Sequence, residues 1–89
     1  MTAERLKRIR LTKHARDKSE FLRRYGFDIS EVSVREAVAS PSLIDRRNDQ
    51  LLALKPLDRE YAIRVVYTMA NRNIVVLTFY PVKRERFNV

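Results

Sequence analysis

The amino-acid sequence predicts an α+β fold in which two N-terminal helices pack on one face of a mostly antiparallel sheet of four to five strands. Helix formers with capping residues fill residues 12–40, whereas β-branched and aromatic residues dominate from residue 43 onward. The chain has 89 residues, of which 45% are hydrophobic and 34% charged. This size and composition are typical of one small globular domain with one core, so we expect a single domain over residues 1–89.

The first two elements follow from local signals. Residues 8–11 alternate basic and apolar side chains, which predicts a short strand. Thr12 stands where a helix N-cap belongs, and Gly26, the only glycine, stands where the helix that continues to Tyr25 should end. On a helical wheel one arc collects the residues that we expect to face the core: His14, Phe21, Leu22 and Tyr25.

A second helix is predicted to begin near Ser30, although Ser33 begins a rival capping box with Glu36. Pro41 should end it, because the residue before a proline avoids the helical conformation. Its buried stripe is expected to comprise Val34, Ala37 and Val38.

Four further strands are predicted at residues 43–44, 51–55, 60–69 and 74–80. Turns at residues 48–49 and 70–73 separate the strands of each pair. The complete order is therefore strand, two helices and four strands. The last two strands form the clearest hairpin.

Arg64 is the one charge in the middle of an apolar strand, and an arginine there is costly to bury. The register that keeps it away from Phe79 places it near Thr78, with Tyr80 close to Ala62. Arg64, Thr78 and Tyr80 then line an accessible face. The opposite face should form the core against the helices, with the residues Tyr61, Ile63, Val65, Val75, Leu77 and Phe79.

The net charge of +8 is concentrated at the two ends of the chain. Residues 1–24 carry nine bases and three acids, and residues 61–89 carry five bases and one acid. If the ends meet in the fold, they form one positive surface that favours a polyanion such as RNA. An acidic protein partner, or simple solubility, would explain the same charge.

Several classes of protein are disfavoured by composition. The chain has no cysteine and one histidine, which argues against disulfides and a zinc site. No apolar run is long enough to cross a bilayer, and the charged N-terminus does not resemble a signal peptide. We therefore expect a cytoplasmic protein without a membrane partner.

The order of the motifs resembles that of small prokaryotic proteins in the RelE/ParE/BrnT toxin superfamily, and most of all a branch described as a domain of unknown function. The motifs are Leu11-Thr-Lys-His-Ala15, Gly26, Ser40-Pro41, Arg-Val-Val-Tyr at 64–67 and Val-Leu-Thr-Phe-Tyr at 76–80. The resemblance implies a RelE-like domain and a toxin that cleaves messenger RNA, possibly on the ribosome. It also implies an acidic antitoxin as partner. Fold alone does not settle function, since some relatives inhibit gyrase instead.

Three residues are candidates for catalysis. Metal-independent cleavage uses the ribose 2′-hydroxyl as nucleophile, so it needs proton transfer and positive charge but no cofactor. His14 can exchange protons near neutral pH, and Arg64, which matches a superfamily arginine, can grip a phosphate with two donors. Tyr80 can stack on a base or donate its hydroxyl. The structural alternatives are a histidine on the apolar arc that hydrogen-bonds to the sheet and fixes the first helix, an ion pair of Arg64 with Asp45 or Glu60, and a tyrosine that covers the core edge.

Eight basic residues are candidates for RNA binding through phosphate contacts: Lys83, Arg84, Arg86, Arg23, Arg24, Lys7, Arg8 and Arg10. Lys83, Arg84 and Arg86 resemble the C-terminal RNA-binding residues of RelE-like toxins in being basic, although their spacing differs. Each of the eight is alternatively a solvated charge. A non-catalytic nucleic-acid-binding module and a protein-interaction domain therefore stand beside the RNA-cleaving toxin as hypotheses.

Overall fold

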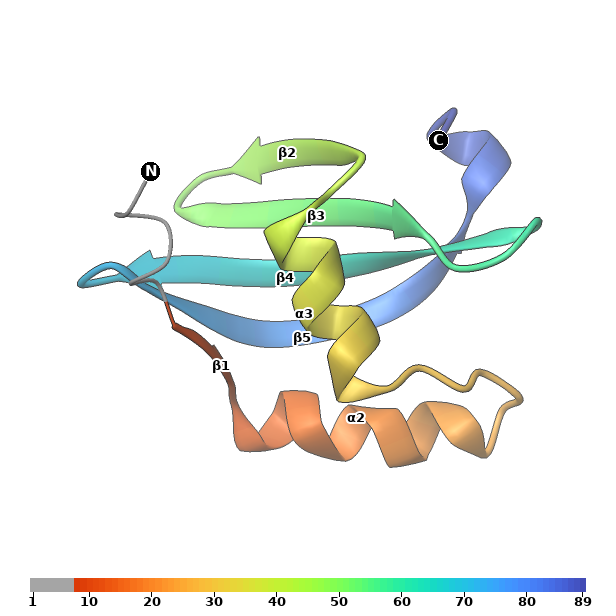
Figure 1. The fold of residues 1–89 in the computed structure, drawn as a ribbon, viewed down its shortest axis with the longest axis horizontal. Coiled ribbons are helices and arrows are strands. Elements are labelled where there is room, and N and C mark those ends of the chain that lie inside the picture. The colour runs from red at the N-terminus through yellow and green to blue at the C-terminus, as the bar shows by residue number, and fades with distance from the viewer. Residues whose placement is uncertain (1–7) are drawn as a thin grey trace.

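The computed structural model describes residues 8–89 as a five-stranded sheet with two helices (Figure 1). The elements in chain order are β1 (Ile9–Leu11), α2 (Lys13–Arg23), α3 (Glu31–Ala39), β2 (Leu43–Arg47), β3 (Gln50–Pro56), β4 (Tyr61–Ala70), β5 (Asn73–Lys83) and the 3-10 turn η1 (Arg84–Arg86). The strand order in the sheet is β1-β5-β4-β3-β2, and only the β1–β5 pair is parallel. This confirms the predicted α+β class and the predicted order of helices and strands.

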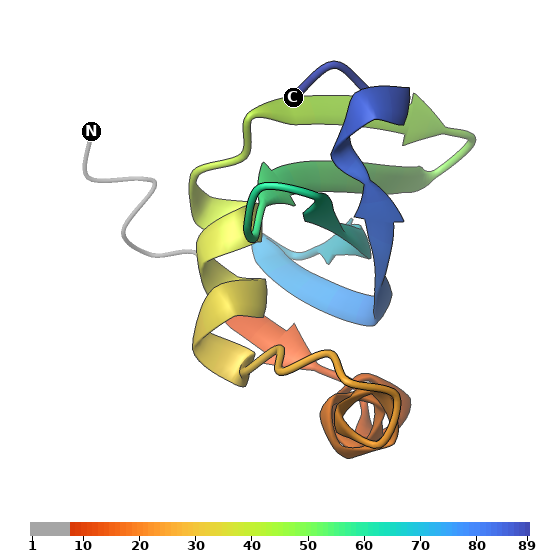
Figure 2. The ribbon, with the colours of Figure 1, turned by 90° about the vertical axis from the view of Figure 1, so that its right-hand side faces the viewer.

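The two helices occupy different places around the sheet. Figures 1 and 2 show α3 crossing one face, whereas α2 lies along the β5 edge and is displaced toward the other side. Ala15 and Leu22 of α2 nevertheless join Val34, Ala37 and Val38 of α3 in one core cluster, so both helices cover the same core, α3 across the face and α2 from its edge. We call the face opposite α3 the back face. The C-terminal turn η1 also lies on that side in Figure 2.

The predicted helix caps are confirmed. The Thr12 hydroxyl accepts a hydrogen bond from the backbone N–H of Ala15 at 3.1 Å, and the Ser30 hydroxyl accepts one from the N–H of Ser33 at 3.2 Å. Ser30 rather than Ser33 is thus the cap of α3. Gly26 has φ of +89°, a left-handed conformation that favours glycine after a helix.

The predicted core arc of α2 is wrong except for Leu22. The helix buries Ala15 and Leu22, while Phe21 and Tyr25 are 49% and 68% exposed and His14 is also exposed. Thr12 sets this rotation, because its N–H donates to the Val76 carbonyl and its hydroxyl donates to the Leu77 carbonyl of β5. The small Ala15 side chain can then approach the sheet closely.

A β-bulge in β5 changes which of its residues reach the core. Val66 pairs with Thr78, but the next residue of β4, Tyr67, pairs with Val76, so Leu77 is the extra residue. The alternation of side chains reverses there. Phe79, Ile63 and Val65 join the core as predicted, whereas Ile74 and Val76 replace the predicted Val75 and Leu77, and Tyr61 is only half-buried.

The register of the β4–β5 hairpin differs from the predicted one by two residues. Arg64 pairs with Tyr80 rather than with Thr78, and Ala62 pairs with Val82. The two-residue loop of Asn71 and Arg72 and the extra residue of the bulge set this register, and β5 continues through Pro81 to Lys83. Proline is tolerated there because β1 pairs with β5 only as far as Val76, so the missing N–H of Pro81 interrupts no β1–β5 ladder. A shift of two preserves the faces, and Phe79 lies opposite Val65, on the other face from Arg64, as predicted.

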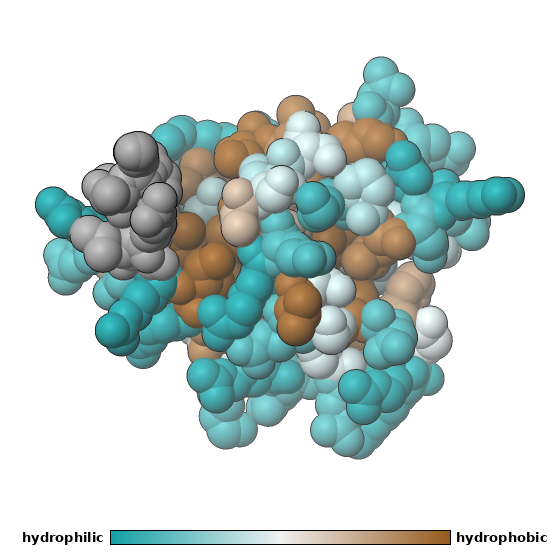
Figure 3. All heavy atoms as spheres, in the orientation of Figure 1, coloured by the Kyte–Doolittle hydropathy of each residue, from teal (hydrophilic) through white to brown (hydrophobic). Residues whose placement is uncertain are grey.

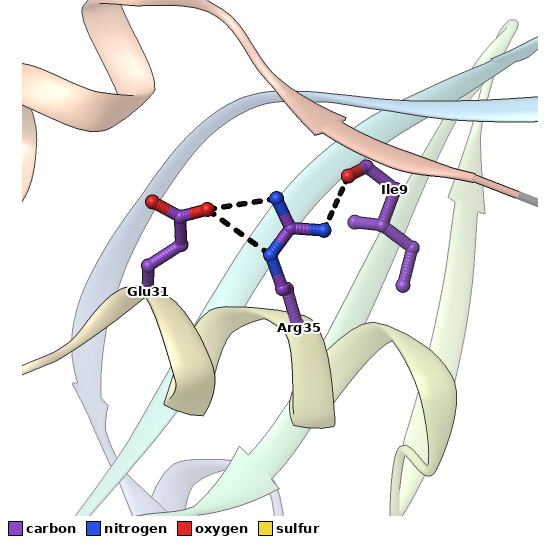
Figure 4. Close-up of polar contacts among 3 residues, drawn as sticks. All are labelled: Ile9, Glu31 and Arg35. Atoms are coloured by element: carbon purple, nitrogen blue, oxygen red, sulfur yellow. Dashed lines mark hydrogen bonds and ion pairs between the residues drawn. The ribbon is translucent and has the colours of Figure 1, made fainter.

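Arg35 ties α3 to β1 (Figure 4). Its guanidinium donates two hydrogen bonds to the Glu31 carboxylate, at 2.7 and 3.1 Å, and one to the carbonyl oxygen of Ile9. The contact joins a short edge strand to the helix on the face of the sheet. It therefore helps to hold the basic strand β1 in place beside β5.

The α3 side of the molecule carries apolar side chains in separate patches between hydrophilic ones (Figure 3). Val32 of α3 is 65% exposed, and Ile44 of β2 is 49% exposed. Within residues 8–89, neither helix has the length and apolar character needed to cross a bilayer.

Candidate functional site

The back face of the sheet carries the predicted arginine at its centre. Directly opposed residues of antiparallel strands share a face, so Leu54, Arg64 and Tyr80 form one row across β3, β4 and β5. Leu52, Val66 and Thr78 form the next row. The aliphatic members of both rows are buried, whereas Arg64, Tyr80 and Thr78 are half-buried. The predicted polar face exists, but it is partly covered rather than open.

Arg64 is covered by the C-terminal segment. The carbon at the centre of its guanidinium lies 5.0 Å from the centroid of the Phe87 ring, a cation–π geometry. Its Nε is buried and has no hydrogen-bond partner among the described residues. The two alternative ion-pair partners are engaged elsewhere, since Glu60 pairs with Lys83 and the Asp45 carboxylate accepts the N–H of Arg46. The structure therefore leaves the donors of Arg64 free of carboxylates within residues 8–89.

His14 reaches the same face from α2. Its Nε2 lies 3.3 Å from the hydroxyl oxygen of Thr78, two residues from Tyr80 on β5. The contact follows from the anchoring of Thr12, which fixes the first turn of α2 beside the bulge. His14 is exposed rather than on a buried arc, but this contact is the hydrogen bond to the sheet that the structural alternative expects, so both roles for His14 stay open. The three candidate catalytic residues are thus brought to one side of the sheet.

The outer surface of α2 continues this site. A shallow hollow of about 260 Å³ is lined by His14, Asp17, Lys18 and Phe21. A neighbouring hollow is lined by Asp17, Glu20, Phe21 and Arg24. Both positive and negative side chains therefore flank the exposed ring of Phe21.

Two of the three C-terminal basic candidates serve the fold. Lys83 forms an ion pair with Glu60, which raises the pKa of Lys83. Arg84 donates to the backbone oxygens of Asp58 and Val89 at 2.7 and 2.9 Å and so holds the C-terminal segment in its turn. Arg86 is exposed and belongs to no ion pair among the described residues. Of these candidates, only Arg86 combines exposure with a free charge.

The other basic candidates do not form one compact patch with the C-terminus. Arg8 precedes β1 and Arg10 lies within it, and β1 pairs with the first residues of β5, whereas the C-terminal bases begin at Lys83. Val76 and Lys83 are seven residues apart along β5, a span of roughly 23 Å in a strand. Arg23 and Arg24 are exposed at the far end of α2 from β1 (Figure 1). Lys7 lies outside the described residues.

Sequence reasoning did not anticipate the part that Phe87 plays. The residue is an isolated apolar side chain among charged ones after the last strand, which is a weak signal that the C-terminus folds back. Its N–H donates to the carbonyl of Arg84 at 3.0 Å, and this closes the turn that brings the ring over Arg64. The exposed aromatic pair on α2 was also missed, because it was assigned to the core.

Asp58 stabilises the turn that supports this C-terminal segment. Its carboxylate accepts the backbone N–H groups of Tyr61 and Glu60, at 2.7 and 2.8 Å, and these two bonds lower the pKa of Asp58, with Arg84 contributing. The charged form is favoured in the folded state. The carboxylate therefore adds stability above its unfolded pKa, and this contribution is lost as pH falls through the lower folded pKa.

We expect Asp58→Asn to reduce the urea midpoint at pH 7, because the amide oxygen is a weaker acceptor than a carboxylate. The difference from wild type should shrink as the pH falls below about 4, where the Asp58 carboxyl of the unfolded chain takes up a proton, and it should be lost once the pH has passed the lower folded pKa. Urea titrations at several pH values measure it. Glu36→Gln, which alters an exposed carboxylate on α3, is the control. A difference that persists unchanged at pH 2 would contradict this role.

Comparison of the chain with protein-family models, with curated proteins and with solved structures found no match.

Proposed function

We propose that this protein is a RelE-like toxin that binds RNA across the back face and cleaves it without a metal ion. The resemblance of its motifs to the RelE/ParE/BrnT superfamily suggests this reading. The geometry of Arg64 is the observation that supports it most directly. The proposed physiological substrate is messenger RNA, with the ribosome as a further site of action.

The support from Arg64 rests on the cost of burying an arginine. A half-buried guanidinium normally has a carboxylate partner, because desolvation of the charge is otherwise uncompensated. Arg64 has none among residues 8–89, and the ring of Phe87 fixes it from one side. A phosphate would supply the missing acceptors, and its oxygens match the planar fork of the guanidinium.

The candidate residues have complementary roles in the proposed cleavage. His14 accepts the proton of the ribose 2′-hydroxyl, whose oxygen attacks the adjacent phosphorus. Arg64 stabilises the negative charge that develops on the phosphoryl oxygens. Tyr80 donates a proton to the 5′-oxygen as its bond to phosphorus breaks. The products are a 2′,3′-cyclic phosphate and a free 5′-hydroxyl.

The proposed protein partner is an acidic antitoxin. The net charge of +8 favours association with an acidic chain as well as with RNA. An antitoxin that places carboxylates near Arg64 would compete directly with a phosphate for the same donors. Inhibition would then follow from occupation of the site.

A non-catalytic RNA-binding module is the second candidate. Lys83 and Arg84 are engaged by Glu60, Asp58 and Val89, which reduces the free positive charge near the C-terminus. The positive charge that stabilises the transition state of cleavage would then have to come from Arg64 and the exposed Arg86. This observation favours binding without efficient cleavage.

The test compares wild type with Arg64→Ala in two assays. Induced expression in a bacterial host should arrest growth with wild type and not with the variant. Purified wild type should convert an end-labelled RNA to a cyclic-phosphate product in the presence of EDTA, at a rate that Arg64→Ala lowers at least tenfold. The matched control is Arg46→Ala, because Arg46 is an exposed arginine that pairs with Leu51 and so lies on the other face of the sheet.

The remaining outcomes separate the candidates. Absence of arrest and of product, with RNA affinity that falls steeply as salt rises, would select the non-catalytic module. RNA affinity that is negligible at 50 mM salt would reject both candidates.

A further inference from the structure

Two aromatic rings stand exposed on α2 and its C-terminal turn. Phe21 is 49% exposed and Tyr25 is 68% exposed, although apolar rings are usually buried in a domain with a formed core. They lie four residues apart, with ring centroids separated by 5.1 Å and planes tilted by 49°. Ala15 and Leu22 already supply the core contacts of this helix. The exposed pair, which we call the aromatic shelf, is therefore not needed to hold α2 in place.

The aromatic shelf is continuous with the candidate site. His14, Lys18, Phe21 and Tyr25 follow one another at helical spacing, and the hollow beside His14 is also lined by Phe21. His14 in turn contacts Thr78 on the back face. The distance along the helix axis from His14 to Tyr25 is about 16 Å. A single extended ligand could therefore touch the shelf and the back face together.

The charges around the shelf suit a polyanion. Lys18 Nζ lies 6.0 Å from the Phe21 ring centroid, and Arg24 lines the hollow on the other side of that ring. Asp17 is paired with Lys13 at 3.1 Å, so its charge is partly compensated. Glu20 is the adverse charge at the shelf. Even with Glu20 present, Lys18 and Arg24 provide a cation on either side of the Phe21 ring.

The chemistry of the shelf favours nucleobases over a protein helix. A helix-binding surface normally presents several aliphatic and aromatic side chains in a broad apolar stripe. Here two planar rings stand between charged side chains, with no aliphatic residue in either hollow. Rings interleaved with cations are typical of proteins that bind single-stranded nucleic acids, where bases stack on the rings and cations contact phosphates.

We infer that the aromatic shelf binds unpaired bases of single-stranded RNA by stacking and so leads the adjacent phosphate toward His14 and Arg64. This inference rests on the proposed RNA-binding function and narrows its substrate class to single strands. Paired bases cannot stack on the shelf, because their faces are covered by neighbours in the duplex.

The test measures binding of a short single-stranded RNA that carries 2-aminopurine, whose fluorescence falls on stacking, and of the same RNA annealed to its complement. The double variant Phe21→Leu/Tyr25→Leu should bind the single strand about a hundredfold more weakly, at roughly tenfold for each ring. It should bind the duplex as wild type does. The slope of log affinity against log salt should not change, because the rings neutralise no phosphate. Tyr25→Phe should retain both affinity and quenching.

The controls separate this inference from the proposed function. Val32→Ala changes a 65% exposed apolar residue on α3 and should not alter RNA binding. Because Phe21 and Tyr25 are exposed, the double variant should keep the wild-type thermal midpoint. If wild type and the double variant bind the single strand equally well while Arg64→Ala still weakens binding, the inference that the aromatic shelf binds bases is wrong. The exposed rings would then be assigned to binding of a protein partner. Failure of wild type to bind RNA at all would overturn the proposed function and the shelf with it.

Discussion

We expect Phe79→Ala to remove most of the stability of the protein and to leave a substantial fraction of it unfolded at 37 °C. Phe79 is the largest of the fully buried side chains, with 0% exposure, and it lies opposite Val65 in the middle of the β4–β5 hairpin. Truncation of a buried phenylalanine costs about 3–5 kcal/mol, from lost burial and the cavity that remains. The total stability of a domain is only about 5–15 kcal/mol, and small domains lie near the lower limit. Circular dichroism during urea and thermal unfolding measures the loss.

Leu77→Ala is the informative control for Phe79→Ala. Simple alternation along β5 would place Leu77 on the same face as Phe79, and equal losses from the two substitutions would then follow. The bulge instead removes Leu77 from the core and leaves it half-buried. We therefore expect Leu77→Ala to cost about 1 kcal/mol or less. A loss comparable to that of Phe79→Ala would contradict the bulge.

The elements of this fold could be predicted because their signals are local. Thr12 and Ser30 cap helices through bonds to N–H groups three residues away, and Gly26 supplies a conformation that other residues adopt at a cost. The hairpin turn at Asn71 and Arg72 is local too, since both residues have positive φ in the two-residue loop. None of these features depends on the rest of the chain.

The bulge could not be predicted, because it depends on side chains distant in sequence. Ile74, Val75, Val76 and Leu77 are all apolar, so the pattern does not say which of them face the core. The choice is made where Thr12 donates to the carbonyls of Val76 and Leu77. The same contact sets the rotation of α2, which explains why the predicted core arc of that helix was also wrong.

The candidate site could be predicted in part. Arg64 and Tyr80 share a face because strand alternation places them there, and a register error of two residues does not alter the face. The position of Phe87 over Arg64 could not be predicted. It requires η1, a local hydrogen bond from Arg84 to the backbone oxygen of Val89, and a bond from Arg84 to the carbonyl oxygen of Asp58, which is distant in the sequence.

Arg64→Met should have opposite effects on stability and on RNA affinity. Methionine reaches only as far as the arginine Nε, but it keeps an apolar stem on the back face, and its sulfur can pack favourably against the Phe87 ring. It removes the buried Nε that has no partner among the described residues, a group whose desolvation costs about 1–3 kcal/mol. The cation–π contact that is lost is worth about 0.5–1 kcal/mol. We therefore expect the variant to be more stable than wild type by about 1 kcal/mol.

RNA affinity should change in the other direction. A hydrogen bond to a charged group contributes about 1.5–3 kcal/mol, so loss of the guanidinium should weaken binding about ten- to a hundredfold. The slope of log affinity against log salt should also fall by about one phosphate contact. Urea midpoints and fluorescence anisotropy on the same preparations measure the two quantities. A structural arginine would lose stability on substitution and leave RNA binding unchanged, so a destabilised Arg64→Met protein with wild-type affinity would reject the assignment. The opposite result, a gain in stability with a loss of RNA affinity, is expected if Arg64 is buried at a cost to stability because a phosphate ligand supplies its missing hydrogen-bond acceptors.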